Sequence, residues 1–187
     1  MTRPDPVEAS SARSSEHPGA ATHLAYFGLG SNLGERDRNV QAALDALAGV
    51  VRLTAVSSVY DTAPLLVTDQ PRFHNAVCAG HTSLAPLDLL HRIKSMEQTL
   101  GRVEGVRFGP RVIDIDLLFY DQLVIETPEL TLPHPRLAER AFVLAPLAEI
   151  APDLLHPVFH VTISALAATV LSGADIRSLG HLLLLPD

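Results

Sequence analysis

Residues 107–120 read RFGPRVIDIDLLFY, and the apolar part of this stretch, residues 112–120, predicts a β-strand. Side chains alternate across a strand, so Asp114 and Asp116 are expected on one face, about 6.5–7 Å apart, with Ile115 on the other. Two like charges side by side on an apolar strand repel each other and lose hydration. A buried strand that carries two carboxylates on one face therefore points to a site rather than to plain packing.

Outward from this strand, the hydrophobic pattern predicts two helices and three further strands. Gly30, Ser31 and Asn32 are expected to form a turn, with Asn32 and Glu35 as a capping box, and Ser83 is the expected cap of the second helix. The expected elements are, in chain order, a strand at 23–29, a helix carrying Val40, Ala43, Leu44 and Leu47, a strand at 50–60, a long loop at 61–72, a strand at 73–82, a helix from Pro86 to Gly101 and the strand at 112–120.

This order of elements, β-α-β-β-α-β, is that of a ferredoxin-like α+β sandwich. We expect an antiparallel sheet with the helices packed on one face and long loops around the active site. Residues 1–22 are rich in Ser, Pro and Ala and predict a disordered tail. Residues 23–171 are then a single domain, ending in short helices and turns, and residues 172–187 a C-terminal extension.

Composition excludes several classes of protein. The chain has 187 residues, is 47% hydrophobic and carries a formal net charge of −7, which argues against a general nucleic-acid binder. A single cysteine, Cys78, excludes a disulfide framework and a Cys-rich zinc site. No apolar run is long enough for a membrane helix, and no secretory signal is visible. We therefore expect a cytoplasmic protein that binds neither membrane nor nucleic acid.

Two arginines stand immediately before the acidic strand. Arg107 and Arg111 could bind phosphate oxygens in forked geometry, and Mg²⁺ in proteins takes one or two carboxylates together with substrate phosphates. An isolated Asp-x-Asp more often marks a solvated edge strand, but the long apolar flank and the arginines favour a metal–phosphate site at Asp114 and Asp116. The same pair would also suit another metal-dependent nucleotidyl or glycosyl transferase, and a non-catalytic ferredoxin-like binding module is a third alternative.

Several separated segments resemble the 6-hydroxymethyl-7,8-dihydropterin pyrophosphokinase family of folate biosynthesis. The most specific is residues 107–118, RFGPRVIDIDLL, and the resemblance covers roughly residues 24–165. The supporting segments are GSNLG at 30–34, SSVYDTAPL at 57–65, DQP at 69–71, NAV at 75–77, Glu97 with Gly101 and Arg102, PHPR at 133–136 and RAFVLAPL at 140–147.

The resemblance implies transfer of the β,γ-pyrophosphoryl unit of ATP to the hydroxymethyl oxygen of the pterin, with release of AMP. It implies two Mg²⁺ ions on Asp114 and Asp116, and ATP as the co-substrate. Arg102, Arg111, Asp114 and Asp116 would be the catalytic residues. The ATP-binding residues would be Leu90, Glu97, Arg102, Arg107, Arg111, Leu117, Thr131, Leu132, His134 and Arg140.

For the pterin, the resemblance implies two aromatic faces, Phe73 and Phe142, around the flat ring, with Asn75 reading its polar edge. A flat heterocycle with a polar rim needs stacking surfaces together with fixed donors and acceptors. Further contacts would come from Thr62, Ala63, Pro64 and Leu65, and Asp114 would lie near the reacting end. The partners expected on this basis are the pterin and ATP, and the chain is expected to be a monomer.

Overall fold

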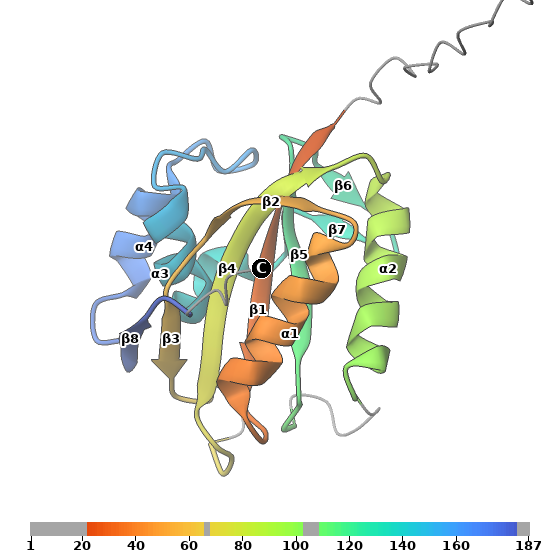
Figure 1. The fold of residues 1–187 in the computed structure, drawn as a ribbon. Helices are drawn as coiled ribbons and strands as arrows, with labels where there is room; N and C mark the ends of the chain where they lie inside the picture. The colour runs from red at the N-terminus through yellow and green to blue at the C-terminus, as the bar shows by residue number, and fades with distance from the viewer. Residues whose placement is uncertain (1–21, 66–67, 103–108, 183–187) are drawn as a thin grey trace, which may run out of the picture.

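The computed structural model describes residues 22–65, 68–102 and 109–182 (Figure 1). The first part of the chain follows the expected order of helices and strands, with one strand more than expected. The elements are β1 (His23–Ser31), α1 (Arg36–Ala48), β2 (Arg52–Val56), β3 (Val59–Thr62), β4 (Phe73–Thr82), α2 (Pro86–Thr99), β5 (Asp114–Tyr120), β6 (Ile125–Glu126), β7 (Thr131–Leu132), the 3-10 helix η1 (Leu137–Glu139), α3 (Ala141–Ile150), α4 (Ile163–Val170) and β8 (Ile176–Gly180).

The main sheet is antiparallel, with strand order β5-β1-β4-β3-β8. β3 pairs with the N-terminal part of β4, and β2 pairs with its C-terminal part. The two central strands, β1 and β4, pair from His23 opposite Thr82 to Ser31 opposite His74. β6 and β7 form a separate two-stranded sheet. This arrangement confirms the expected ferredoxin-like α+β fold. None of the helices that the structure describes is both long and apolar enough to cross a membrane.

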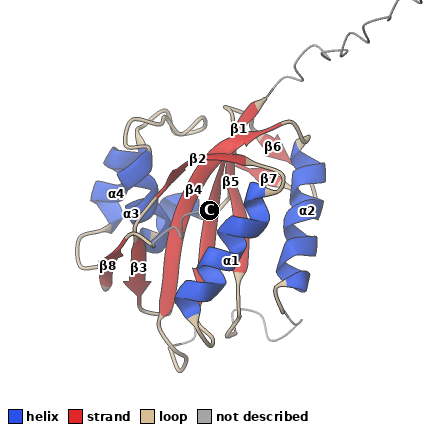
Figure 2. Ribbon diagram, in the orientation of Figure 1, coloured by secondary structure: helices blue, strands red, loops and turns tan. Residues whose placement is uncertain are grey.

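The two helices that the sequence predicted, α1 and α2, lie on one face of the sheet as expected, and α3 and α4 cover the other face (Figure 2). β4 explains why, because its residues are buried almost without a break. Its Ala76 and Cys78 pack toward α1 and α2, whereas Val77 and Ala79 pack toward α3 and α4. A strand buried on both faces reads as a continuous apolar run, and that run needs a helical layer on each side.

β5 is the edge strand that carries the acidic pair. Ile115 packs in the core under α1 and α2, and Asp114 and Asp116 point to the opposite face, as alternation predicts. The pairing of β1 with β5 shifts register at Tyr26. Leu118 lies at this irregularity and joins the core under α3 and α4. The acidic residues therefore stand just before the buried half of the strand.

The expected strand at 50–60 is two strands, β2 and β3, and the loop expected from residue 61 begins only after Thr62. The strand is interrupted at Ser57 and Ser58. There the backbone N–H and the hydroxyl of Ser58 both donate hydrogen bonds to Glu149 of α3, at 2.9 and 3.0 Å. The Ser57 hydroxyl accepts from the N–H of Val77 at 2.9 Å. Tertiary hydrogen bonds thus replace the strand ladder at this point.

Two expected caps are also absent. Glu35 is the N-cap of α1 and Ala85 that of α2, and neither makes a side-chain capping hydrogen bond. Asn32, expected to cap α1, instead joins two loops, because its Oδ1 accepts from the Arg111 N–H at 2.8 Å and its Nδ2 donates to Gln70 Oε1 at 3.0 Å. Asn32 is nearly fully buried, so these bonds are protected from water.

The C-terminal extension contributes to the sheet. β8 pairs with β3, with Thr62 opposite Ile176 and Asp61 opposite Arg177. The sheet therefore continues past the boundary expected at residue 171. Short, mostly exposed strands of this kind carry no hydrophobic alternation, and so the sequence offers little signal for them.

Candidate active site

A pocket opens on the α3 side of the sheet, where β1, β4 and β5 meet the loop between β3 and β4. It is apolar at one end and charged at the other. Gly30 of β1 forms part of its floor, and a Cβ there would lie 2.9 Å from Asn75 Oδ1, so glycine is needed for this close approach. The residues that line it are Gly28, Leu29, Gly30, Thr62, Ala63, Leu65, Gln70, Phe73, Asn75, Ala76, Val77, Arg111, Asp114, Asp116, Arg136, Arg140, Phe142 and Val143.

The apolar end brings together most of the residues that the resemblance assigned to the pterin. Those that line the pocket are Thr62, Ala63, Leu65, Phe73, Asn75, Asp114 and Phe142. Pro64 is not among them. Asn75 is buried, and its Nδ2 donates to Thr62 Oγ1 at 2.7 Å, which fixes the orientation of the amide. The Arg140 guanidinium lies 5.5 Å from the centre of the Phe142 ring and joins the two ends of the pocket.

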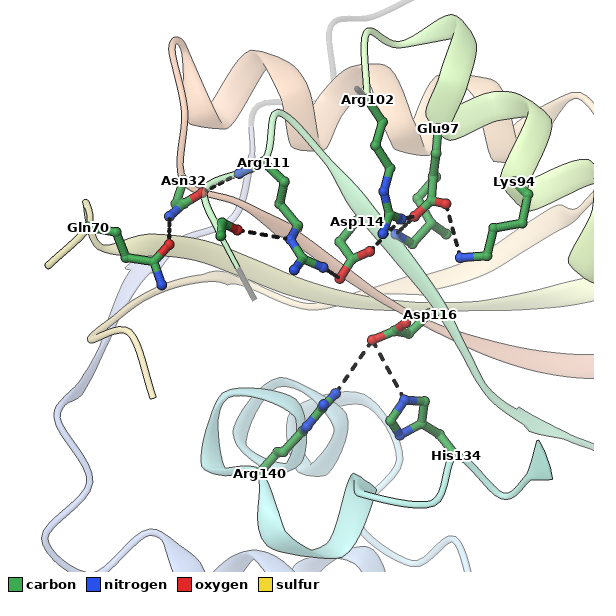
Figure 3. Close-up of polar contacts among 12 residues, drawn as sticks. Asn32, Gln70, Lys94, Glu97, Arg102, Arg111, Asp114, Asp116, His134 and Arg140 are labelled. Atoms are coloured by element: carbon green, nitrogen blue, oxygen red, sulfur yellow. Dashed lines mark hydrogen bonds and ion pairs between the residues drawn. The ribbon is translucent and has the colours of Figure 1, made fainter. Parts of the chain in front are cut away.

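Asp114 is held by two arginines (Figure 3). Arg102 Nη1 donates to its Oδ1 at 2.7 Å, and Arg111 Nη1 donates to its Oδ2 at 2.6 Å. Burial opposes ionisation of this carboxyl, but the positive charges of Arg111 and Arg102 outweigh burial, and the net effect lowers the pKa of Asp114. Asp114 is therefore an anion at neutral pH.

The negative charge of Asp116 is balanced by nearby positive groups much less well than that of Asp114. Its Oδ2 lies 3.6 Å from Arg140 Nη1 and 3.9 Å from His134 Nε2. Burial, and next the charge of Asp114, raise the pKa of Asp116, although Arg140 opposes the rise. Burial and the neighbouring Arg140 lower the pKa of His134 to about 4, so His134 is neutral at pH 7 and adds no positive charge. The electrostatics favour an added cation beside Asp116.

Glu97 lies behind this pair rather than in the pocket. Its side chain is only 1% exposed and accepts hydrogen bonds from the Ile115 N–H at 2.8 Å, from Lys94 Nζ at 3.0 Å and from Arg102 Nη1. Burial raises the pKa of Glu97 in spite of these donors. Glu97 thus holds the beginning of β5, through Ile115, and also Arg102, which itself contacts Asp114.

The remaining residues assigned to ATP are divided among several places. Arg111 and Arg140 line the pocket, and Arg107 lies outside the described residues. Leu117 and Leu132 are buried in the core under α1 and α2, Leu90 packs against that core, and Thr131 is partly buried in β7. Their contribution to an adenine slot stays a prediction.

Gln70 and Arg136 line the pocket but were not among the predicted site residues. Both stood in segments that carried the family resemblance, DQP at 69–71 and PHPR at 133–136. Single polar residues in turns have no periodicity, so no sequence pattern indicated that either side chain lies at the pocket.

The donor set fits Mg²⁺ bound jointly with a phosphate ligand. Within the ranges that the structure describes, no group of three or more His, Cys, Asp or Glu side chains could hold a metal ion alone. Two carboxylates do face the pocket, and the only positive side chain that the described part of the chain places beside Asp116 is Arg140, at 3.6 Å. Because Mg²⁺ is usually held by one or two carboxylates plus phosphate oxygens and water, these residues fit an ion that arrives with a nucleotide.

The fold and the pocket define the chain as a ferredoxin-like α+β protein with an arginine- and aspartate-lined site at one end of its sheet. A family model described as 7,8-dihydro-6-hydroxymethylpterin-pyrophosphokinase (HPPK) matches residues 26–152. The chain therefore belongs to this family.

Similar proteins agree with this assignment. The chain is 45% identical over 152 residues to the 2-amino-4-hydroxy-6-hydroxymethyldihydropteridine pyrophosphokinase of Pseudomonas aeruginosa, covering 80% of this chain and 94% of that protein. It is 38% identical over 167 residues to the folic acid synthesis protein FOL1 of Dictyostelium discoideum, of which it spans only 25%. The solved structure of Plasmodium falciparum HPPK-DHPS superposes with a TM-score of 0.68 at 16% identity, covering 83% of this chain and 46% of that one.

Proposed function

We propose that this chain transfers the pyrophosphoryl group of ATP to 6-hydroxymethyl-7,8-dihydropterin. The pocket carries this proposal, because it joins an aromatic slot at Phe73 and Phe142 to an acidic and arginine-rich end within one cavity. In the reaction, the hydroxymethyl oxygen forms a bond to the β-phosphorus of ATP. The bond from that phosphorus to the oxygen bridging the α- and β-phosphates breaks, AMP leaves, and the hydroxyl proton is lost.

The described residues divide this work between them. Phe73 and Phe142 stack on the pterin and Asn75 reads its edge, which holds the hydroxyl at the acidic end. Arg111, Arg140 and, behind them, Arg102 supply positive charge to the phosphates. Asp114 and Asp116 would hold Mg²⁺, which when bound neutralises phosphate charge and orients the triphosphate. A monomeric state and a cytoplasmic location stay predictions.

Label transfer tests this function directly. With Mg²⁺ and ATP carrying ³²P in its β-phosphate, the label should appear in the pterin product and none should appear in ADP. A different nucleotidyl transferase would leave the pterin unlabelled. A binding module without catalysis would leave all of the label in ATP.

Phe142→Ala should weaken pterin affinity about tenfold, because an aromatic stacking face contributes about 1–1.5 kcal/mol beyond its buried area. The affinity for a non-hydrolysable ATP analogue should change less than about twofold. Titration calorimetry with each ligand measures both effects. Phe159→Ala, an exposed aromatic outside the pocket, is the matched control. Equal losses for both ligands would make Phe142 a core residue instead.

A further inference from the structure

The loop between β3 and β4, which begins at Ala63, is held where its two ends meet by a charged cluster whose residues do not line the pocket. Arg72 stands one residue before β4, and its guanidinium contacts Asp61 of β3 and Asp175 just before β8. We call Asp61, Arg72 and Asp175 the Arg72 clamp. Asp175 lies outside residues 26–152, which the family model matches.

The contacts of the clamp are directional. Arg72 Nη1 and Nη2 donate to the two carboxylate oxygens of Asp175 at 2.6 and 3.1 Å, which is forked geometry. Arg72 Nε donates to Asp61 Oδ2 at 2.7 Å, and Nη2 also reaches the Asp61 carbonyl at 3.3 Å. One guanidinium thus joins both ends of the loop to the last strand. Forked arginine–carboxylate pairs restrict orientation as well as distance.

The Asp61 side of the clamp is anchored firmly. The Asp61 side chain is 14% exposed, and its Oδ1 lies 3.6 Å from Arg36 Nη1 and 3.8 Å from His74 Nε2. Arg36 Nη1 also donates to the Arg72 carbonyl at 2.9 Å. These contacts leave Asp175, whose side chain is 69% exposed, as the one member of the clamp that solvent reaches freely.

The clamp connects directly to the pterin end of the pocket. The Ala63 N–H donates to the Asp175 carbonyl at 3.2 Å, and Thr62 is opposite Ile176 in the β3–β8 pairing. Phe73, which supplies an aromatic face of the pocket, is the residue after Arg72. A shift at Asp175 would therefore move Thr62, Ala63 and Phe73 together, whereas Asp116 and Arg140 lie on other elements.

We propose that Arg72 and Asp175 are positioning residues for the pterin, and that the C-terminal strand β8 sets the spacing of the pocket wall through them. This inference rests on the proposed function, since it assigns the apolar end to the pterin. It predicts that loss of the Asp175 carboxylate lowers the affinity for the pterin and leaves the affinity for ATP unchanged.

The test compares Asp175→Asn with the wild-type chain. Because exposed ion pairs contribute little energy, the expected effect is small, and the pterin dissociation constant should rise about three- to fivefold. The dissociation constant of a non-hydrolysable ATP analogue should stay within about twofold. Asp175→Glu, which keeps the charge, should recover most of the lost pterin affinity. Asp153→Asn, an exposed aspartate before α4, is the control and should change neither ligand.

Amide hydrogen exchange provides a readout that does not need the reaction. Asp175→Asn should speed exchange at Ala63 and leave exchange at Ile115 of β5 unchanged. Unchanged pterin affinity would overturn the proposal, whatever the exchange rate at Ala63, and so would equal losses of affinity for both ligands. A wild-type chain that binds no pterin would contradict the proposed function, and Ala63 exchange would still decide whether Asp175 holds the loop.

Discussion

Asp116→Asn is expected to lower turnover about 10³-fold, which is the scale for removing one preorganised electrostatic contact to a developing charge. The asparagine keeps the size of the side chain but removes the charge that would bind the cation. Asp116 faces the pocket, and among the residues that the structure describes its closest counter-charge is Arg140, at 3.6 Å. Steady-state AMP formation at saturating pterin and Mg·ATP measures the effect.

The same variant should not be less stable at neutral pH. The pKa of Asp116 is raised above its ordinary value of 3.8, by burial first and then by Asp114. Ionised Asp116 thus costs folding free energy, a cost absent below pH 3.8 that grows as pH rises through the folded pKa. Removing the charge removes this cost, so urea unfolding at pH 7 should give an equal or higher free energy of unfolding.

Asp153→Asn, at an exposed aspartate outside the helices, is the matched control for both measurements. It should alter neither turnover nor stability appreciably. If Asp116→Asn unfolds the chain instead, the acidic pair is structural and its proposed part in Mg²⁺ binding is wrong.

Glu97→Ala is expected to lower the free energy of unfolding by about 3 kcal/mol, because it removes the acceptor of a buried backbone N–H and the anchor of a partly buried arginine. The Ile115 N–H and Arg102 Nη1 both donate to Glu97 Oε1. Glu97→Gln keeps an acceptor for Ile115 and should lose only about 1 kcal/mol. Urea denaturation of the wild-type protein, Glu97→Ala and Glu97→Gln measures the three free energies of unfolding.

Gln98→Ala, on the exposed face of the same helix, controls for helix propensity and should change stability by less than about 0.5 kcal/mol. A loss for Glu97→Ala no larger than that of Gln98→Ala would contradict a structural role. Glu97 would then act only through the nucleotide, which is the role that the family resemblance implied.

The residues that the sequence placed well share a strong local signal. Asp114 and Asp116 alternate with apolar residues, and alternation alone put both carboxylates on one face. β4 matches its expected bounds because its centre, residues 76–79, is apolar and turn-forming residues flank the strand, with Pro71 before it and Ser83 after it. The order of elements along the first 120 residues then allowed few folds other than the ferredoxin-like sandwich.

The errors arose where contacts distant in sequence override local preference. Glu149 breaks the expected strand at Ser58 from 91 residues away, and Asn32 bonds to Arg111 rather than to α1. β8 forms by pairing with β3 and is held through Asp175 by Arg72, and these distant contacts produce no recognisable pattern within residues 172–187. The second layer of helices did have a signal, the apolar run at residues 76–79 of β4, because a strand with only one buried face would alternate apolar and polar residues there.

The most direct test of the central claim is to incubate the purified chain with ATP and 6-hydroxymethyl-7,8-dihydropterin, with and without Mg²⁺, and to separate the nucleotides. The account predicts AMP in a one-to-one ratio with the pterin consumed, and only when the pterin and Mg²⁺ are both present. Formation of ADP, or AMP formation that does not depend on the pterin, would contradict it.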